Sequence, residues 1–200
     1  MAWRQTSLLH DHLDGSICLM PVLQELFEMS GKKYPFQGSP EEQHDSVKQL
    51  FKNPQINLVE KFSNTTGVMQ TKETLALAAE SYVRERAKQG FLYCEATIAP
   101  QYHVFEGLKV PQVVEALIEG IRRGEKAYPH IEVDILFTLG REIDAEKAVM
   151  LVNAAGECDR NYVVGIGLAC DEADNPPEKH FKMFARAKEL GFKTTCHAGE

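Results

Sequence analysis

Apolar and polar positions along this chain recur with two different spacings, and the change from one to the other predicts the order of its elements. From residue 91 onward, each short apolar run is followed by a longer segment with helical periodicity. The expected strands are Phe91–Ala96, Ile131–Leu139, Val163–Leu168 and Lys193–His197, and helices are expected to begin near Val110, Asp144 and Pro177. Because strands recur every ~30–40 residues with helices between them, the pattern predicts serial βαβ units and a parallel sheet.

Residues with strong preferences for helix ends support these boundaries. Pro111 and Pro177 suit the first turn of a helix, where the missing N–H is not needed. Gly90 and Gly191 suit C-terminal caps, and Asp144 is expected to cap a helix N-terminus.

An earlier strand, Ser7–Leu13, precedes a long segment with its own helical patterns near 21–30, 41–52, 57–64 and 72–89. We therefore expect a helical insertion over about residues 20–88 after the first strand. The expected fold class is α/β, namely the first five β/α units of a TIM barrel, because a closed (β/α)₈ barrel has eight strands and typically ~250 residues. Residues 1–200 are interpreted as a single domain that is incomplete at its C-terminus. An open doubly wound sheet is the alternative, but the expected G-x-G-x-x-G is absent after the first strand.

Composition narrows the function classes. The 200 residues are 44% hydrophobic and 26% charged, as in an ordinary globular domain. A net charge of -7 argues against a nucleic-acid partner, and the apolar runs are too short for a membrane span or a secretory signal. The five cysteines include no C-x-x-C pair, which fits a reducing compartment. A cytoplasmic protein without a membrane partner is expected, and its oligomeric state is left open.

Candidate chemistry begins at the end of the first strand, in His10-Asp11-His12-Leu13-Asp14-Gly15. Residues two apart in a strand share a face, so the rings of His10 and His12 are expected to converge. The last expected strand ends in Cys196-His197-Ala198-Gly199-Glu200, which supplies a third imidazole at another carboxyl end. Three His ligands with an open position are typical of a water-activating zinc site. The alternative for His10 and His12 alone is a pair of polar residues on an edge strand or turn.

His-x-His-x-Asp-Gly on the first strand and His-Ala-Gly-Glu on the fifth, in that order and at that separation, resemble the adenosine deaminase family over the whole chain. The resemblance implies that His10, His12 and His197 bind one Zn²⁺ per chain. It also implies that Glu200 is the catalytic acid that protonates the purine ring nitrogen.

The same resemblance implies a set of substrate-binding residues, namely Asp14, Gly15, Cys170, Leu58 and Phe62. Asp14 would contact the ribose hydroxyl of a nucleoside, although a turn residue before Gly15 is equally compatible with the pattern. Leu58 and Phe62 would belong to an apolar lid over the pocket, with simple core packing as the alternative.

Several positions depart from the family pattern. Cys170 stands where the family usually has Gly, Thr97 where an Arg is common, and Asp11 on the outer strand face where an apolar residue is expected. The family's remaining site residues, a His and an Asp pair, would follow Glu200, so the 200-residue chain alone is expected to be inactive.

Other polar residues receive no catalytic role. The remaining histidines have no partner at ligand spacing and are expected in loops or on helix surfaces: His44, His103, His130 and His180. Glu95 and Asp134 are interpreted either as supporting carboxylates near the site or as structural ones.

The function predicted from these observations is zinc-dependent hydrolytic deamination of adenosine or 2′-deoxyadenosine, with release of ammonia. Its small-molecule substrate would be a purine nucleoside. The alternatives are deamination of adenine or another 6-aminopurine, an inactive zinc- or nucleoside-binding domain, and a metal-dependent amidohydrolase with a different substrate.

Overall fold

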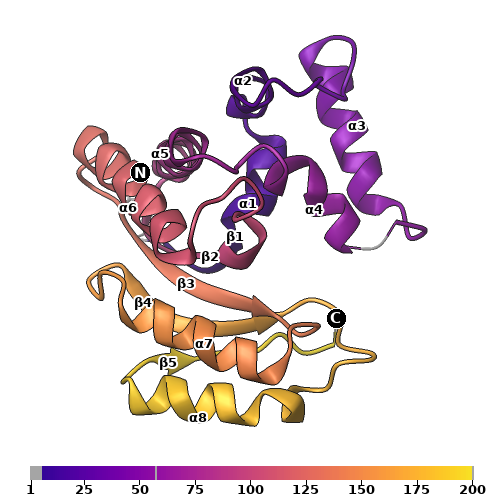
Figure 1. The fold of residues 1–200 in the computed structure, drawn as a ribbon. Coiled ribbons are helices and arrows are strands. Elements are labelled where there is room, and N and C mark those ends of the chain that lie inside the picture. Colours follow the sequence, from indigo (N-terminus) through magenta and orange to yellow (C-terminus); the bar gives the residue numbers. More distant parts are fainter. Residues whose placement is uncertain (1–5, 57, 200) are drawn as a thin grey trace.

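The chain folds around one curved parallel sheet with strand order β1-β2-β3-β4-β5 (Figure 1). The computed structural model describes residues 6–56 and 58–199, without the side chains of residues 58 and 59. The strands are β1 Thr6–His12, β2 Phe91–Ile98, β3 Glu132–Gly140, β4 Val163–Ala169 and β5 Lys193–Thr194. All four neighbouring pairs are parallel, as the alternation of apolar runs and helices predicts.

The assigned bounds of β5 are shorter than the expected strand. Its ladder to β4 nevertheless continues, since the Thr195 amide donates to the Ile166 carbonyl at 3.0 Å and the His197 amide to the Leu168 carbonyl at 2.9 Å. His197 therefore lies at the carboxyl end of the hydrogen-bonded β5 segment, and His12 lies at the carboxyl end of β1.

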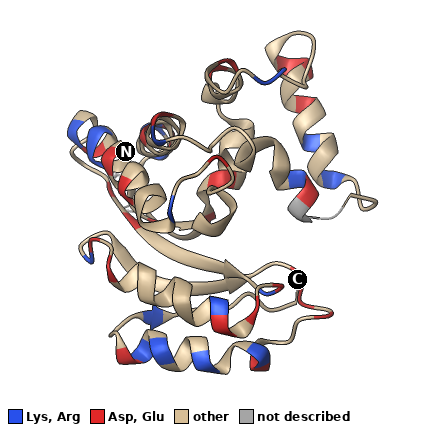
Figure 2. Cartoon of the chain, in the orientation of Figure 1, with Lys and Arg blue, Asp and Glu red and all other residues tan. Residues whose placement is uncertain are grey.

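Helices between successive strands form an outer layer. These are α6 Val110–Ala127, α7 Ala145–Gly156 and α8 Phe181–Glu189, and the short 3₁₀ segments η2 Pro100–Tyr102 and η3 Pro177–His180 precede α6 and α8. Asp144 caps α7 as expected, because its carboxylate accepts from the Glu146 and Lys147 amides at 2.8 and 3.2 Å. Both Lys or Arg and Asp or Glu occur on the outer helices, whereas the strands carry few charged residues (Figure 2).

Among the described residues, six helical segments lie between β1 and β2. They are α1 Leu13–Ser16, η1 Ile17–Leu19, α2 Val22–Met29, α3 Pro40–Lys52, α4 Leu58–Thr66 and α5 Lys72–Lys88. The last of them, α5, packs on α6 and β2 and so belongs to the outer helix layer. Figure 1 shows α3 and α4 to one side of the sheet, near the carboxyl end of β1.

Two of the four remaining histidines are buried, which their expected place in loops or on helix surfaces does not predict. His44 and His130 are exposed as expected, but His103 and His180 are fully buried. Each buried ring is held by a backbone carbonyl, His103 by that of Met69 and His180 by that of Arg141, both at 2.9 Å. One ring nitrogen of each buried imidazole is therefore hydrogen-bonded, which lowers the free-energy cost of burying the ring.

Candidate active site

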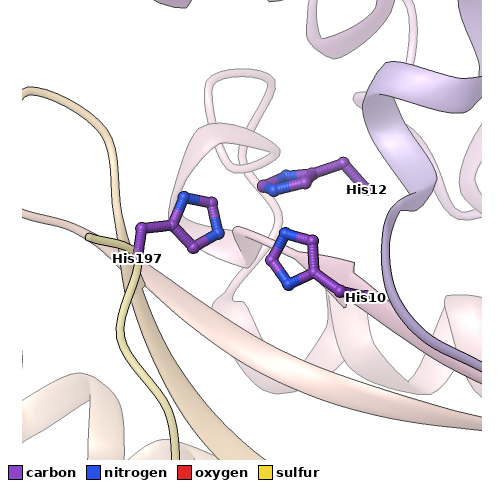
Figure 3. Close-up of side chains that lie close together, drawn as sticks. All are labelled: His10, His12 and His197. Carbon is purple, nitrogen blue, oxygen red and sulfur yellow. The ribbon is translucent and has the colours of Figure 1, made fainter. Parts of the chain in front are cut away.

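Three imidazoles converge at the carboxyl ends of the two edge strands. His10 and His12 come from β1, and His197 comes from the segment that extends β5 (Figure 3). The ring centroids of His197 lie 4.8 Å from His10 and 5.2 Å from His12, and one nitrogen from each of the three rings lies within 4.8 Å of the others. Curvature of the sheet therefore brings together residues from opposite edges.

The donor set fits zinc. Zinc bound tetrahedrally at about 2.0–2.1 Å from each nitrogen holds its ligand atoms about 3.3 Å apart. Small ring movements, each less than about 1 Å, would bring His10, His12 and His197 to that spacing. Neutral imidazole is also the ligand that zinc prefers in catalytic sites with an open position.

A cavity of about 320 Å³ lies beside His12. Its walls come mainly from the carboxyl ends of the strands, from α4 and from η2. The lining residues are His12, Asp14, Phe62, Ser63, Thr66, Thr97, Ala99, Tyr102, Phe105, Thr138, Leu139, Ala169 and Cys170. Three of the expected substrate-binding residues, Asp14, Phe62 and Cys170, are therefore brought to one cavity.

Asp14 is a buried carboxylate on the cavity wall, 4% exposed, in the short helix α1. One of its oxygens accepts from the Gly15 amide at 3.0 Å, and the other lies 3.8 Å from Nε2 of the buried His103. Nδ1 of His103 faces the Met69 carbonyl, which directs Nε2 toward Asp14. His103 is thus a polar neighbour of the cavity that no local pattern predicts, because it is a single residue in a loop.

Gly15 and Phe62 are in direct contact. A Cβ atom at Gly15 would lie 2.5 Å from Cε1 of Phe62, so a side chain there would displace the ring. The Phe62 ring also lies 5.8 Å from the ring of His12, measured between centroids. Gly15 accordingly leaves room for the Phe62 ring beside His12 on the cavity wall.

Cys170 adopts a backbone conformation that favours glycine, with φ of 76°. Its sulfur lies 3.8 Å from the hydroxyl of Tyr102, which also hydrogen-bonds Glu142. Burial, reinforced by Cys170 and Glu142, raises the pKa of Tyr102, so this hydroxyl stays protonated. The thiol therefore occupies cavity wall at a position whose backbone geometry is the one expected for the family's Gly.

Asp11, which sequence alone could not explain, belongs to a polar cluster behind β1. Its carboxylate accepts from Nε of Arg86 on α5 and from the hydroxyl of Ser16, both at 2.7 Å. Nη2 of Arg86 donates to the same Ser16 hydroxyl at 2.8 Å. The helix α5 thus provides the partner for a charge on the outer strand face.

Two expected site positions cannot be placed. Glu200 and the side chain of Leu58 lie outside the described residues.

Glu95 and Asp134 are neighbours across β2 and β3, and both accept from the hydroxyl of Tyr93, at 3.2 and 2.8 Å. Asp134 lies near the amino end of β3 and Glu95 in the middle of β2, and neither side chain lines the cavity.

Comparison with known proteins identifies the family of this chain. A sequence model of the family described as "Adenosine deaminase" matches residues 6–200. The chain belongs to the adenosine deaminase family. Adenosine deaminase 1 of Streptomyces coelicolor is 34% identical over 203 residues, which cover 96% of this chain and 49% of that protein.

Solved structures of similar fold include TIM barrels at low sequence identity. An adenine deaminase from Arthrobacter aurescens matches 96% of this chain and 57% of its own, with a TM-score of 0.78 and 23% identity. An amidohydrolase from Burkholderia ambifaria with bound zinc matches 98% of this chain and 52% of its own, with a TM-score of 0.80 and 24% identity. The five-stranded sheet is therefore the first five β/α units of the TIM barrel used by the adenosine deaminase family.

The chain spans about half the length of the curated relatives that it matches. In the described part of the chain, no helix is both long and apolar enough to cross a membrane.

Proposed function

We propose that this chain supplies zinc ligands and much of the substrate pocket of an enzyme that hydrolyses adenosine or 2′-deoxyadenosine to the inosine form and ammonia. The observation that carries the proposal is the convergence of three imidazoles beside a cavity with one buried carboxylate. Membership of the adenosine deaminase family and the zinc bound in the Burkholderia amidohydrolase support it.

His10, His12 and His197 would hold one zinc ion per chain. When bound at such a site, zinc lowers the pKa of water toward ~7 and so supplies hydroxide at neutral pH. The three imidazoles must be neutral to bind, and their position at the carboxyl ends of the strands would direct the reaction toward the cavity.

Glu200 would donate a proton to the purine ring nitrogen next to the attacked carbon. Addition of hydroxide to that carbon moves an electron pair onto the ring nitrogen, and protonation there makes the addition favourable. Expulsion of ammonia then restores the aromatic ring, so water and adenosine give inosine and ammonia.

Asp14 would accept a hydrogen bond from a ribose hydroxyl, held in place by the Gly15 amide and His103. Phe62, with Leu58, would cover the purine, and Gly15 would leave space for the Phe62 ring. Cys170 would lie against the purine where other members of the family have Gly.

A neutral nucleoside suits this cavity better than a nucleotide. Among the described residues that line it there is no Lys or Arg to bind a phosphate, and the buried Asp14 would repel one. Adenine and other 6-aminopurines remain the alternative substrates.

The test uses the full-length zinc-loaded protein and follows the absorbance change as adenosine becomes inosine. His12→Ala should lose zinc and turnover together, whereas the control His44→Ala, exposed on α3, should keep both. Glu200→Gln should keep zinc while turnover falls by ~10²–10⁴-fold, as for loss of a general acid. Conversion of adenine but not adenosine would contradict the substrate, and failure to bind zinc would contradict the site.

A further inference from the structure

Arg141 is a fully buried cation that lies outside the cavity wall and joins the carboxyl ends of three strands. It directly follows β3, and its amide donates to the carbonyl of Ala169, the last residue of β4, at 2.9 Å. Its guanidinium reaches the segment that extends β5, where Nη2 donates to the carbonyl oxygen of His197 at 2.5 Å. The same nitrogen lies 3.5 Å from the sulfur of Cys196.

The guanidinium also has two partners in the loop after β4. Nη2 lies 3.4 Å from a carboxylate oxygen of Glu172, in the loop after β4, and Nη1 donates to the carbonyl of Asn175 at 3.5 Å. The backbone carbonyl of Arg141 in turn accepts from Lys179 at 3.0 Å and from the buried His180 at 2.9 Å. A charge buried this completely is tolerated only when it is paired and hydrogen-bonded, so the surrounding loops are fixed relative to it.

The consequence falls on His197. In the described segment after β5, the amides of Thr195 and His197 hydrogen-bond to β4. The carbonyl of His197 is not part of this ladder and needs a different partner to be fixed in place. The charge-assisted hydrogen bond from Arg141 to the His197 carbonyl fixes the peptide plane on the carboxyl side of His197. The hydrogen bond from the His197 amide to the Leu168 carbonyl fixes the peptide plane on its amino side. With both flanking peptides held, the imidazole of His197 is directed toward His10 and His12 (Figure 3).

We propose that Arg141 is a positioning residue for the metal site, which preorganises His197 as a zinc ligand through its main-chain carbonyl. The inference rests on the proposed zinc site. Arginine suits this role better than lysine, because a planar guanidinium contacts the His197 carbonyl through Nη2 and the Asn175 carbonyl through Nη1 in one fixed geometry. Groups that orient metal ligands typically change metal affinity by ~10–100-fold when they are removed.

The chain offers a matched control in Arg160. This arginine also bonds main-chain carbonyls, that of Leu190 at 3.0 Å and that of Val163 at 3.3 Å. Val163 begins β4, so Arg160 acts at the opposite ends of the strands from His197. Loss of Arg160 should therefore affect stability without reaching the metal ligands.

The experiment measures zinc dissociation constants of the full-length protein by competition with a chromogenic chelator, together with thermal unfolding of the metal-free protein. R141Q is expected to weaken zinc binding by ~10–100-fold, and R160Q by less than ~3-fold even where both lower the unfolding temperature. Amide hydrogen exchange at His197 should accelerate in R141Q and stay unchanged in R160Q.

Unaltered zinc affinity in R141Q would overturn the inference and leave the proposed function standing. If R141Q does not fold, the test uses R141K, because lysine keeps the positive charge but lacks the planar, two-armed guanidinium. Weakening by ~10-fold in R141K supports the inference and wild-type affinity overturns it. Failure of the unaltered protein to bind zinc would overturn the proposed function and this inference together.

Discussion

Substitution of Arg86 by Met tests whether the charged cluster behind β1 stabilises the strand that carries His10 and His12. The Arg86 and Asp11 side chains are 13% and 19% exposed, and their closest atoms are 2.7 Å apart. Removal of Arg86 leaves the Asp11 carboxylate largely buried, with the hydroxyl of Ser16 as a remaining donor.

The magnitude follows from this partial burial. Loss of one partner from a fully buried ion pair costs ~3–5 kcal/mol, whereas an exposed pair contributes ~0.2–1 kcal/mol. Because both side chains keep some contact with water and Ser16 remains, we expect Arg86→Met to lower the free energy of unfolding by ~2–3 kcal/mol. The double variant Asp11→Leu with Arg86→Met should lose less than the sum of the two single variants, since it leaves no unpaired charge.

The assay is urea unfolding of the full-length protein after removal of metal, because bound zinc would add its own stabilisation. Arg84→Met is the matched control on the same helix, since Arg84 is 36% exposed and pairs with Glu85 at 3.4 Å. Its loss should cost less than ~1 kcal/mol. If Arg86→Met and Arg84→Met differ by less than ~0.5 kcal/mol, or if the double variant shows full additivity, the cluster does not act as argued.

Two further predictions concern packing and thiol chemistry. A Cβ at Gly120 would lie 2.1 Å from the backbone oxygen of Ala76, so Gly120→Ala should destabilise by ~1–3 kcal/mol in thermal unfolding, despite better helix propensity. Gly156→Ala, whose Cβ would meet a flexible leucine at 3.0 Å, should change stability by less than ~1 kcal/mol, and equal effects would contradict the argument. Burial raises the pKa of Cys18 to about 12, which lowers its thiolate fraction at pH 8, so peptide mapping should find exposed Cys196 alkylated first and Cys18 only on unfolding. Comparable rates in the folded protein would contradict the burial of Cys18.

The alternation of strands and helices was predictable because it depends on local periodicity. The expected strands at Phe91, Ile131 and Val163 begin within one residue of β2, β3 and β4, and the Asp144 cap depends on its own carboxylate and the next few amides. Parallel pairing follows as well, because a helix between two strands returns the chain to the same end of the sheet.

The burial of certain polar residues could not be predicted in this way. The partners of His103 and Asp11, which are Asp14 and Arg86, lie in other elements far away in the sequence. Their burial depends on how α5 and the loop after β2 pack on β1, and no local pattern encodes that packing.

The sequence by itself determined the parallel β/α order and the residue types of the candidate site, since His-x-His and His-Ala-Gly-Glu are local motifs at strand ends. Only the tertiary structure decided that His10, His12 and His197 meet, because that requires the sheet to curve until its two edge strands face each other. It also placed Arg141 against the His197 carbonyl, a contact between residues on separate loops that exists only once β3, β4 and β5 lie side by side.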